Sequence, residues 1–143
     1  MPYDPVLVQP MREELTQLGV EELRTADEVD AGLGAREGTT LLVINSVCGC
    51  AAGNARPAVA MARHHPVQPD RQVTVFAGQD VEATARARGY IPGYPPSSPS
   101  MALLRNGELV LMLERKDIEG RMAAEIAKDL TDAYDLHCTR QTS

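Results

Sequence analysis

The sequence is poor in cysteine and has no long apolar run. Three of its 143 residues are cysteines, Cys48, Cys50 and Cys138, too few and too unevenly spaced for the disulfide framework of a secreted domain. The first residues lack the basic region followed by an apolar stretch that marks a secretory signal. No apolar run approaches the roughly 18 residues of a membrane span. We therefore expect a protein of the reducing cytoplasm without a membrane segment.

Basic residues are also in the minority. The 14 lysines and arginines stand against 20 aspartates and glutamates, which gives a formal net charge of −6. This negative balance argues against nucleic acid or an anionic membrane as a partner. No internal repeat or low-complexity tract divides the chain. The length predicts one domain over residues 1–143, long enough to bury about two-thirds of the surface of the unfolded chain.

Hydrophobic spacing and capping signals predict several helices. Met11, Leu15 and Leu18 recur at helical spacing, so we expect an N-terminal helix over about 6–18. Thr25 opens a Ser/Thr-x-x-Glu capping box and with it a second helix. Further helices are expected at 51–63, interrupted by Pro57, at 80–88, with Asp80 as N-cap and Gly89 as stop, and near the C-terminus, with Met122, Ile126 and Leu130 on one face.

Strands are expected between these helices. Asn106 and Gly107 form a strong hairpin signal between two apolar segments. The expected strands are 20–23 at an edge, 40–45 at the centre, 73–76, and the hairpin pair 101–104 and 109–113. Helices and strands that alternate in this way build a sheet covered on both faces, and the antiparallel hairpin makes that sheet mixed.

Two cysteines stand at the end of the central strand. Cys48 and Cys50 follow the apolar run 40–45 at a strand-to-helix turn, with Gly49 between them. A thiol in the first turn of a helix meets unpaired backbone N–H groups, which stabilise the thiolate that attacks disulfides. A ring closed across one residue is expected to be strained and easy to reduce. We interpret the pair as a redox site rather than as buried small residues or half of a zinc site, because zinc knuckles usually space cysteines more widely.

Three separated motifs resemble one known family. The dithiol segment and the proline-strand-turn at 99–108 are similar to those of the thioredoxin fold, with Pro99 at the position of the fold's cis-proline. More specifically, the chain resembles the bacilliredoxins, on segments 45–53 (Asn-Ser-Val-Cys-Gly-Cys-Ala-Ala-Gly), 76–80 (Phe-Ala-Gly-Gln-Asp) and 96–103 (Pro-Ser-Ser-Pro-Ser-Met-Ala-Leu). The resemblance implies an α/β, thioredoxin-like fold, with a central mixed β-sheet flanked by helices on both faces.

The resemblance also implies a reaction. Bacilliredoxins cleave mixed disulfides between protein cysteines and bacillithiol, a small thiol of some bacteria, so Cys48 is expected to attack and Cys50 to resolve. The expected partners are S-bacillithiolated proteins, bacillithiol as co-substrate, and a bacillithiol disulfide reductase acting on the released disulfide. No tightly bound cofactor and no metal are expected.

Five further residues are expected to support this dithiol. Gly49 is expected to permit the tight geometry, and a cis peptide at Ser98–Pro99 is expected to place backbone where an extended client segment pairs with it. Asn45 and Ser46 are expected to hydrogen-bond the sulfur or the turn, with ordinary strand-end hydrogen bonding as an equal alternative.

The chain departs from ordinary thioredoxins in having Val47 where a tryptophan usually stands, and no tryptophan anywhere. General thioredoxin activity and recycling by thioredoxin reductase are therefore not implied. Three other functions stay open: a disulfide isomerase or general oxidoreductase, a zinc or iron–sulfur binding module, and an adaptor whose cysteines have ordinary pKa values. Refolding of a scrambled protein, metal analysis and thiol titration distinguish them.

Two helical features are expected to lack a chemical role. His64 and His65 occupy adjacent helical positions, which point apart, so a solvated helix end is expected rather than a metal site shared with Cys138. For Arg56 a solvated guanidinium is the simpler expectation, against a role beside the thiolate or at the carboxylates of bacillithiol.

The end of the chain and one loop are also expected to be accessory. Cys138 is expected to be an exposed accessory thiol, with intermolecular disulfide formation as the alternative, at the start of a disordered tail over residues 138–143. Tyr90 and Tyr94 are expected to pack their proline-rich loop, with client binding as the alternative.

Overall fold

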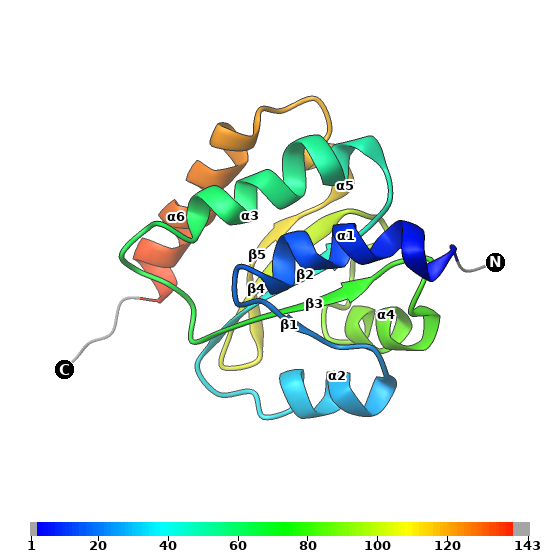
Figure 1. Cartoon of the computed structure of the whole chain (residues 1–143). Helices are drawn as coiled ribbons and strands as arrows, with labels where there is room; N and C mark the ends of the chain where they lie inside the picture. Colours follow the sequence, from blue (N-terminus) through cyan, green and yellow to red (C-terminus); the bar gives the residue numbers. More distant parts are fainter. Residues whose placement is uncertain (1–2, 139–143) are drawn as a thin grey trace.

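The computed structural model describes residues 3–138, and a five-stranded β-sheet forms its centre (Figure 1). The strand order is β1-β3-β2-β4-β5; β3 is parallel to both β1 and β2, whereas β4 is antiparallel to both β2 and β5. The predicted mixed sheet is therefore confirmed. The strands are β1 (Glu21–Glu22), β2 (Thr39–Asn45), β3 (Arg71–Phe76), β4 (Ser100–Arg105) and β5 (Glu108–Leu113).

Helices cover both faces of this sheet, as predicted (Figure 1). On one face α1, α3 and α6 bury Leu15, Val59 and Ile126. On the other face α2 and α4 bury Val29 and Ala83. The helices are α1 (Pro5–Thr16), α2 (Ala26–Leu33), the π-helical turn η1 (Ala51–Ala55), α3 (Arg56–Ala62), α4 (Val81–Arg88), α5 (Arg115–Ile118) and α6 (Ala123–His137).

Strand β2 runs through the middle of the sheet and is buried along its whole length. Leu41 and Val43 face α1, α3 and α6, whereas Leu42 and Ile44 face α2 and α4. A strand covered on both faces needs a continuous apolar sequence, which explains the run at 41–44. Within residues 3–138, none of the helices combines the length and the apolar character that crossing a membrane requires.

The structure corrects the predicted faces of the first and last helices. The side of α1 that meets the sheet carries Val8, Arg12 and Leu15, whereas Met11, predicted to face the core, is half-buried. Arg12 can occupy a buried position because Glu22 and Asp80 accept its hydrogen bonds. Met122 precedes α6 and is 72% exposed, so it lies outside the apolar face to which it was assigned.

Two short elements surround the site, and one of them was predicted as part of a helix. The helix expected at 51–63 is present as the turn η1 followed by α3, and Pro57 lies in the first turn of α3, where its missing N–H costs no hydrogen bond. Helix α5 follows β5 directly, and Glu114 and Asp117 cap its start reciprocally. This acidic pair falls outside the Ser/Thr-x-x-Glu signature, which explains why α5 was missed.

The predicted hairpin is confirmed and brings distant loops together. Asn106 has φ 52° and Gly107 has φ 85°, as a type I′ turn requires. At the other end of the hairpin, Ser100 pairs with Ile44 of β2, and Met101 pairs with the end of β5. The segments before β4 and after β5 therefore lie at the end of β2, beside the cysteines.

Candidate dithiol site

Cys48 and Cys50 lie just beyond the C-terminal end of β2, where the chain turns into η1. Their Sγ atoms are 3.3 Å apart, and both thiols are reduced and half-buried. A disulfide bond is about 2.05 Å long, so a small side-chain movement closes the pair. The predicted dithiol is therefore preformed at the end of a rigid strand.

The two thiols have different environments. Burial pushes the pKa of Cys48 up, but hydrogen bonds from the Cys50 thiol, the Ser46 hydroxyl and the backbone amides of Ala51 and Cys50 outweigh it, so the pKa of Cys48 is lowered. The pKa of Cys50 is raised by burial and by its hydrogen bond and charge interaction with Cys48. Cys48 is therefore the thiol that ionises first, as a nucleophile must.

Asn45 and Ser46 support the turn. Ser46 Oγ accepts a hydrogen bond from the backbone N–H of Cys48 at 3.1 Å. Asn45 Oδ1 accepts one from the backbone N–H of Ser46 at 2.8 Å, and Asn45 Nδ2 donates to the carbonyl of Met11 at 3.2 Å. Ser46 thus contacts Cys48, whereas Asn45 connects the turn to α1.

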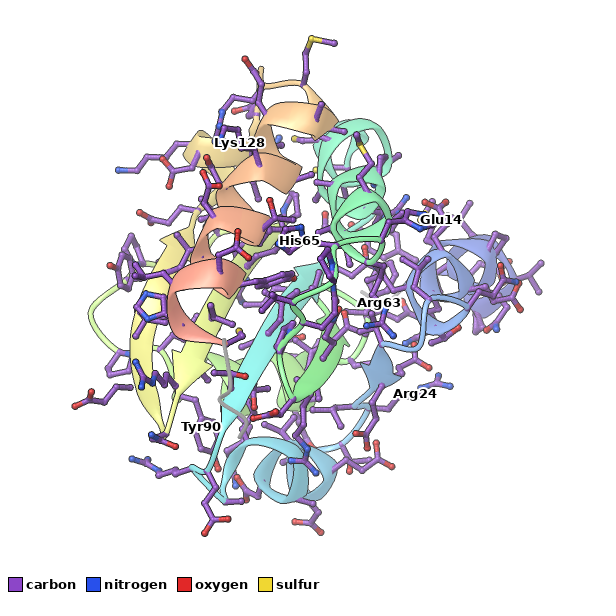
Figure 2. The ribbon with its side chains drawn as sticks, turned by 90° about the vertical axis from the view of Figure 1, so that its left-hand side faces the viewer. Glu14, Arg24, Arg63, His65, Tyr90 and Lys128 are labelled. Carbon is purple, nitrogen blue, oxygen red and sulfur yellow. The ribbon has the colours of Figure 1, made fainter. Side chains whose placement is uncertain are left out.

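The prediction of a solvated Arg56 is wrong. Arg56 is 2% exposed, and its guanidinium donates to Asn45 Oδ1, to the carbonyl of Ser46 and to Glu14 Oε1, each at 2.8 Å. Figure 2 shows Glu14 on the side of α1 that lies beside α3. A buried guanidinium is stable when each N–H finds an acceptor, and here the acceptors come from the turn that carries the cysteines.

The peptide bond between Ser98 and Pro99 is cis, as expected. Pro99 directly precedes β4, whose first residue Ser100 pairs with Ile44, so Pro99 lies opposite the end of β2. Ser97 and Ser98 face α5: Ser97 Oγ accepts from the backbone N–H of Arg115 at 3.3 Å. Pairing of a client segment with this backbone stays a prediction.

Helix α5 and the residue that follows it contribute two charged side chains that the sequence analysis missed. Glu119 Oε2 lies 4.0 Å from Cys50 Sγ, and Arg115 Nη2 lies 3.3 Å from the same Glu119 oxygen. The negative charges of Cys50 and Cys48 raise the pKa of Arg115, which places this cation within electrostatic reach of both sulfurs. The available signal was an Arg/Glu pair spaced i, i+4 directly after a predicted strand.

Gly49 has no steric reason to be glycine in the reduced pair. Its φ is not positive, and a Cβ atom at this position meets no heavy atom within 4 Å. A role for Gly49 in the tighter geometry of a closed disulfide stays a prediction.

The remaining candidates lie away from the dithiol. His64 is exposed, while His65 Nε2 lies 2.8 Å from Asp135 Oδ1 of α6. Among residues 3–138 there is no group of three or more His, Cys, Asp and Glu side chains arranged to hold a metal ion. Cys138 is half-buried against the hydrophobic core, which corrects the expectation of an exposed thiol. Of the tail predicted to be disordered, residues 138–143, only Cys138 is among the described residues, and residues 139–143 lie outside them.

The two tyrosines of the proline-rich loop differ. The Tyr90 hydroxyl donates to Asp30 Oδ1 at 2.8 Å, and Tyr90 lies beside α2 (Figure 2), so it packs the loop as expected. Tyr94 is 42% exposed, so loop packing and client binding both stay predictions for this residue.

Sequence comparison finds close relatives along nearly the whole chain. Residues 3–138 match the family model described as "Disulphide isomerase". A bacilliredoxin of Salinibacter ruber is 63% identical over 143 residues, which cover 96% of this chain and 82% of that protein. A bacilliredoxin of Koribacter versatilis is 57% identical over 136 residues, 95% of this chain and 94% of that protein.

Structure comparison identifies the fold as that of thioredoxin. The thioredoxin of Fasciola hepatica superposes with a TM-score of 0.57 at 18% identity, over 82% of this chain and 99% of that one. The thioredoxin of Malassezia sympodialis gives 0.56 at 14% identity, over 84% and 91%. At such low identity the likeness shows a shared backbone arrangement, and the dithiol occupies the strand-to-helix turn of that arrangement.

Proposed function

Because the chain belongs to the bacilliredoxin family, we propose that it removes bacillithiol from client proteins that carry it as a mixed disulfide on cysteine. The chain is a thiol-disulfide oxidoreductase with a thioredoxin fold. The single observation that carries the proposal is the reduced pair Cys48–Cys50, with sulfurs 3.3 Å apart and a lowered pKa at Cys48. The chain has few cysteines, as is typical of proteins that work in a reducing cytoplasm, and we propose that the reaction takes place there.

In the first step the Cys48 thiolate attacks the bacillithiol sulfur of the client's mixed disulfide. The new bond joins Cys48 to bacillithiol, the old S–S bond breaks, and the client sulfur leaves with the electron pair as a thiolate. Backbone amides and the Ser46 hydroxyl favour the attacking thiolate. The cis segment at Ser98 and Pro99 is the proposed surface for the client backbone.

Two routes then clear Cys48. Cys50 attacks the Cys48 sulfur, closes the disulfide and releases bacillithiol, or a second bacillithiol molecule attacks in place of Cys50. The second route releases bacillithiol disulfide, the substrate of the expected reductase. The proximity of the two sulfurs favours the first route.

Intact-mass analysis tests the proposal. A bacillithiol-modified client is mixed with wild type, Cys48→Ala and Cys50→Ala, each in a Cys138→Ser background so that the third thiol adds no signal. Bacillithiol is expected to move onto Cys50→Ala and to stay on the client in the presence of Cys48→Ala. A client that keeps its bacillithiol with all three proteins rules the proposal out.

The description of the matching family model favours a second candidate, disulfide isomerisation. The same dithiol attacks a non-native protein disulfide and leaves when the correct partner thiol returns. Recovery of activity by a scrambled disulfide protein, compared between wild type and Cys48→Ala, measures this candidate independently of bacillithiol.

A further inference from the structure

The resolving step requires a proton acceptor for Cys50. In the reduced pair the Cys50 thiol is hydrogen-bonded to Cys48. Once Cys48 carries a substrate in a mixed disulfide, it no longer has a thiolate charge. The Cys50 proton must then pass to another base when Cys50 attacks.

One carboxylate is in direct contact with Cys50. Glu119 Oε2 lies 4.0 Å from Cys50 Sγ, within hydrogen-bond range for a sulfur donor. Glu119 directly follows α5, and its backbone N–H donates to the carbonyl of Arg115 at 2.7 Å. Its carboxylate is therefore aimed at the dithiol by a short capped helix rather than by a free loop.

Arg115 holds this carboxylate in place. Arg115 Nη2 lies 3.3 Å from Glu119 Oε2, and Arg115 Nη1 lies 3.5 Å from the carbonyl of Ser98. The Arg115–Glu119 pair thus connects the segment before the cis-proline to Cys50. The Glu119 side chain is 58% exposed, so a proton received from Cys50 can pass on to water.

We infer that Glu119 accepts the proton of Cys50 while Cys50 attacks the mixed disulfide on Cys48. The inference rests on the resolving role of Cys50 in the proposed function. The Cys50 sulfur forms a bond to the Cys48 sulfur, the bond from Cys48 to the substrate sulfur breaks, and that sulfur leaves as a thiolate with the electron pair. The Cys50 proton moves to the Glu119 carboxylate and from there to water or to the departing thiolate.

Electrostatics alone predicts the opposite effect for this residue. Cys48, Arg115 and Glu119 are the charged groups that act on Cys50: Arg115 lowers the pKa of Cys50, whereas Glu119 raises it. A Glu119 that acted only through its charge would disfavour the Cys50 thiolate and slow resolution. Its removal would then accelerate resolution, whereas removal of a proton acceptor slows it.

A stopped-flow experiment with 4,4′-dithiodipyridine separates the two steps. This uncharged disulfide releases one thiopyridone when Cys48 attacks and a second when Cys50 resolves. The proteins compared are wild type, Glu119→Gln, and Glu108→Gln as a control that removes an equal charge from an exposed position of β5. All three carry Cys138→Ser, and the first release in each trace reports that the site is intact.

The second release is expected to slow at least about tenfold in Glu119→Gln at pH 7, relative to the first release, and to be unchanged in Glu108→Gln. The rates of the second release in wild type and Glu119→Gln are expected to converge above the pKa of Cys50, where Cys50 has no proton left to transfer. A second release that is unchanged or faster, or that is slowed equally at high pH, overturns the inference.

The outcome is separable from that of the proposed function. If wild type shows no second release of thiopyridone, Cys50 does not resolve the mixed disulfide, and the inference is overturned. Bacillithiol transfer onto Cys48 still stands in that case. Conversely, a client that keeps its bacillithiol refutes the proposed function, and the dithiodipyridine traces still decide the role of Glu119.

Discussion

At the scale of single residues, the two cysteines have different chemistry although one glycine separates them. Cys48 receives hydrogen bonds from backbone amides and from Ser46, which favour its thiolate. Cys50 faces the negative charges of Cys48 and Glu119, which favour its protonated form. The groups around each sulfur therefore support the proposed roles of Cys48 as the attacking thiol and Cys50 as the resolving thiol.

Cys50→Ala is expected to raise the pKa of Cys48, because the Cys50 hydrogen bond is the largest of the contacts that lower it. On acidification the Cys48 thiolate is then protonated at a higher pH than in the protein that keeps Cys50, and Cys48 reacts more slowly at neutral pH. The pKa of Cys48 is measured from the ultraviolet absorbance of the thiolate as a function of pH, in a Cys138→Ser background. The reference is the pKa of the first titration step in the protein that keeps both Cys48 and Cys50. A Cys48 pKa equal to or below that first step contradicts the prediction.

At the scale of elements, the β4–β5 hairpin determines what surrounds the dithiol. Its open end carries the cis-proline on one side and α5 on the other, both at the end of β2. Its closed end is held by two hydrogen bonds between Asn106 and Gly38, one in each direction, of 2.8 and 2.9 Å. The turn thus sets the register that delivers Arg115 and Glu119 to the cysteines.

Gly107→Ala is expected to lower the free energy of unfolding by about 1–2 kcal/mol. Gly107 has φ 85°, and a Cβ atom there lies 3.0 Å from the side chain of Arg36, so both the backbone and the space oppose a side chain. Urea unfolding measures the effect, with Gly53→Ala as the matched control. A Cβ at Gly53 meets nothing within 4 Å, so this variant is expected to be unchanged or more stable by up to about 1 kcal/mol. Equal stability of the two variants would count against the turn argument.

At the scale of the whole molecule, two buried arginines hold α1 on the sheet. Arg56 of α3 binds Glu14 of α1. Arg12 of α1 binds Glu22 at 2.6 Å and Asp80 at 2.7 Å, and its guanidinium lies 5.2 Å from the centre of the Phe76 ring. Asp80 precedes α4 as predicted, yet it makes no side-chain cap, because its carboxylate is bound to Arg12. These ion pairs join α1 to elements from both faces of the sheet.

Asp80→Ala is expected to destabilise the protein by about 2–3 kcal/mol, because Arg12 stays buried with Glu22 as its remaining carboxylate. Chemical denaturation compares this variant with Asp132→Ala. Asp132 pairs with Lys128 on α6, with side chains 60% and 73% exposed, so its loss is expected to cost less than about 1 kcal/mol. If Asp80→Ala loses as little free energy of unfolding as Asp132→Ala, the buried ion pairs of Arg12 do not secure α1.

The sequence by itself determined most of the elements and the position of the dithiol. The apolar run at 41–44, the Asn106–Gly107 turn and the capping box at Thr25 are local signals, and the structure contains the strand, the hairpin and the helix that each predicts. The cysteines follow directly from the end of a predicted strand. Such features depend on residues close in the chain, whose conformational preferences act before any long-range contact.

The tertiary structure alone decided which charged groups surround the thiols and which are buried. Arg56 was expected to be solvated and arginines are mostly exposed in proteins, yet Arg12 and Arg56 are both buried because other elements supply acceptors, such as Asp80, 68 residues from Arg12 along the chain. Glu119 meets Cys50 across 69 residues, through the register of two strand pairs and a short helix with an acidic cap. No local pattern encodes these contacts, because they arise when separate elements pack against one another.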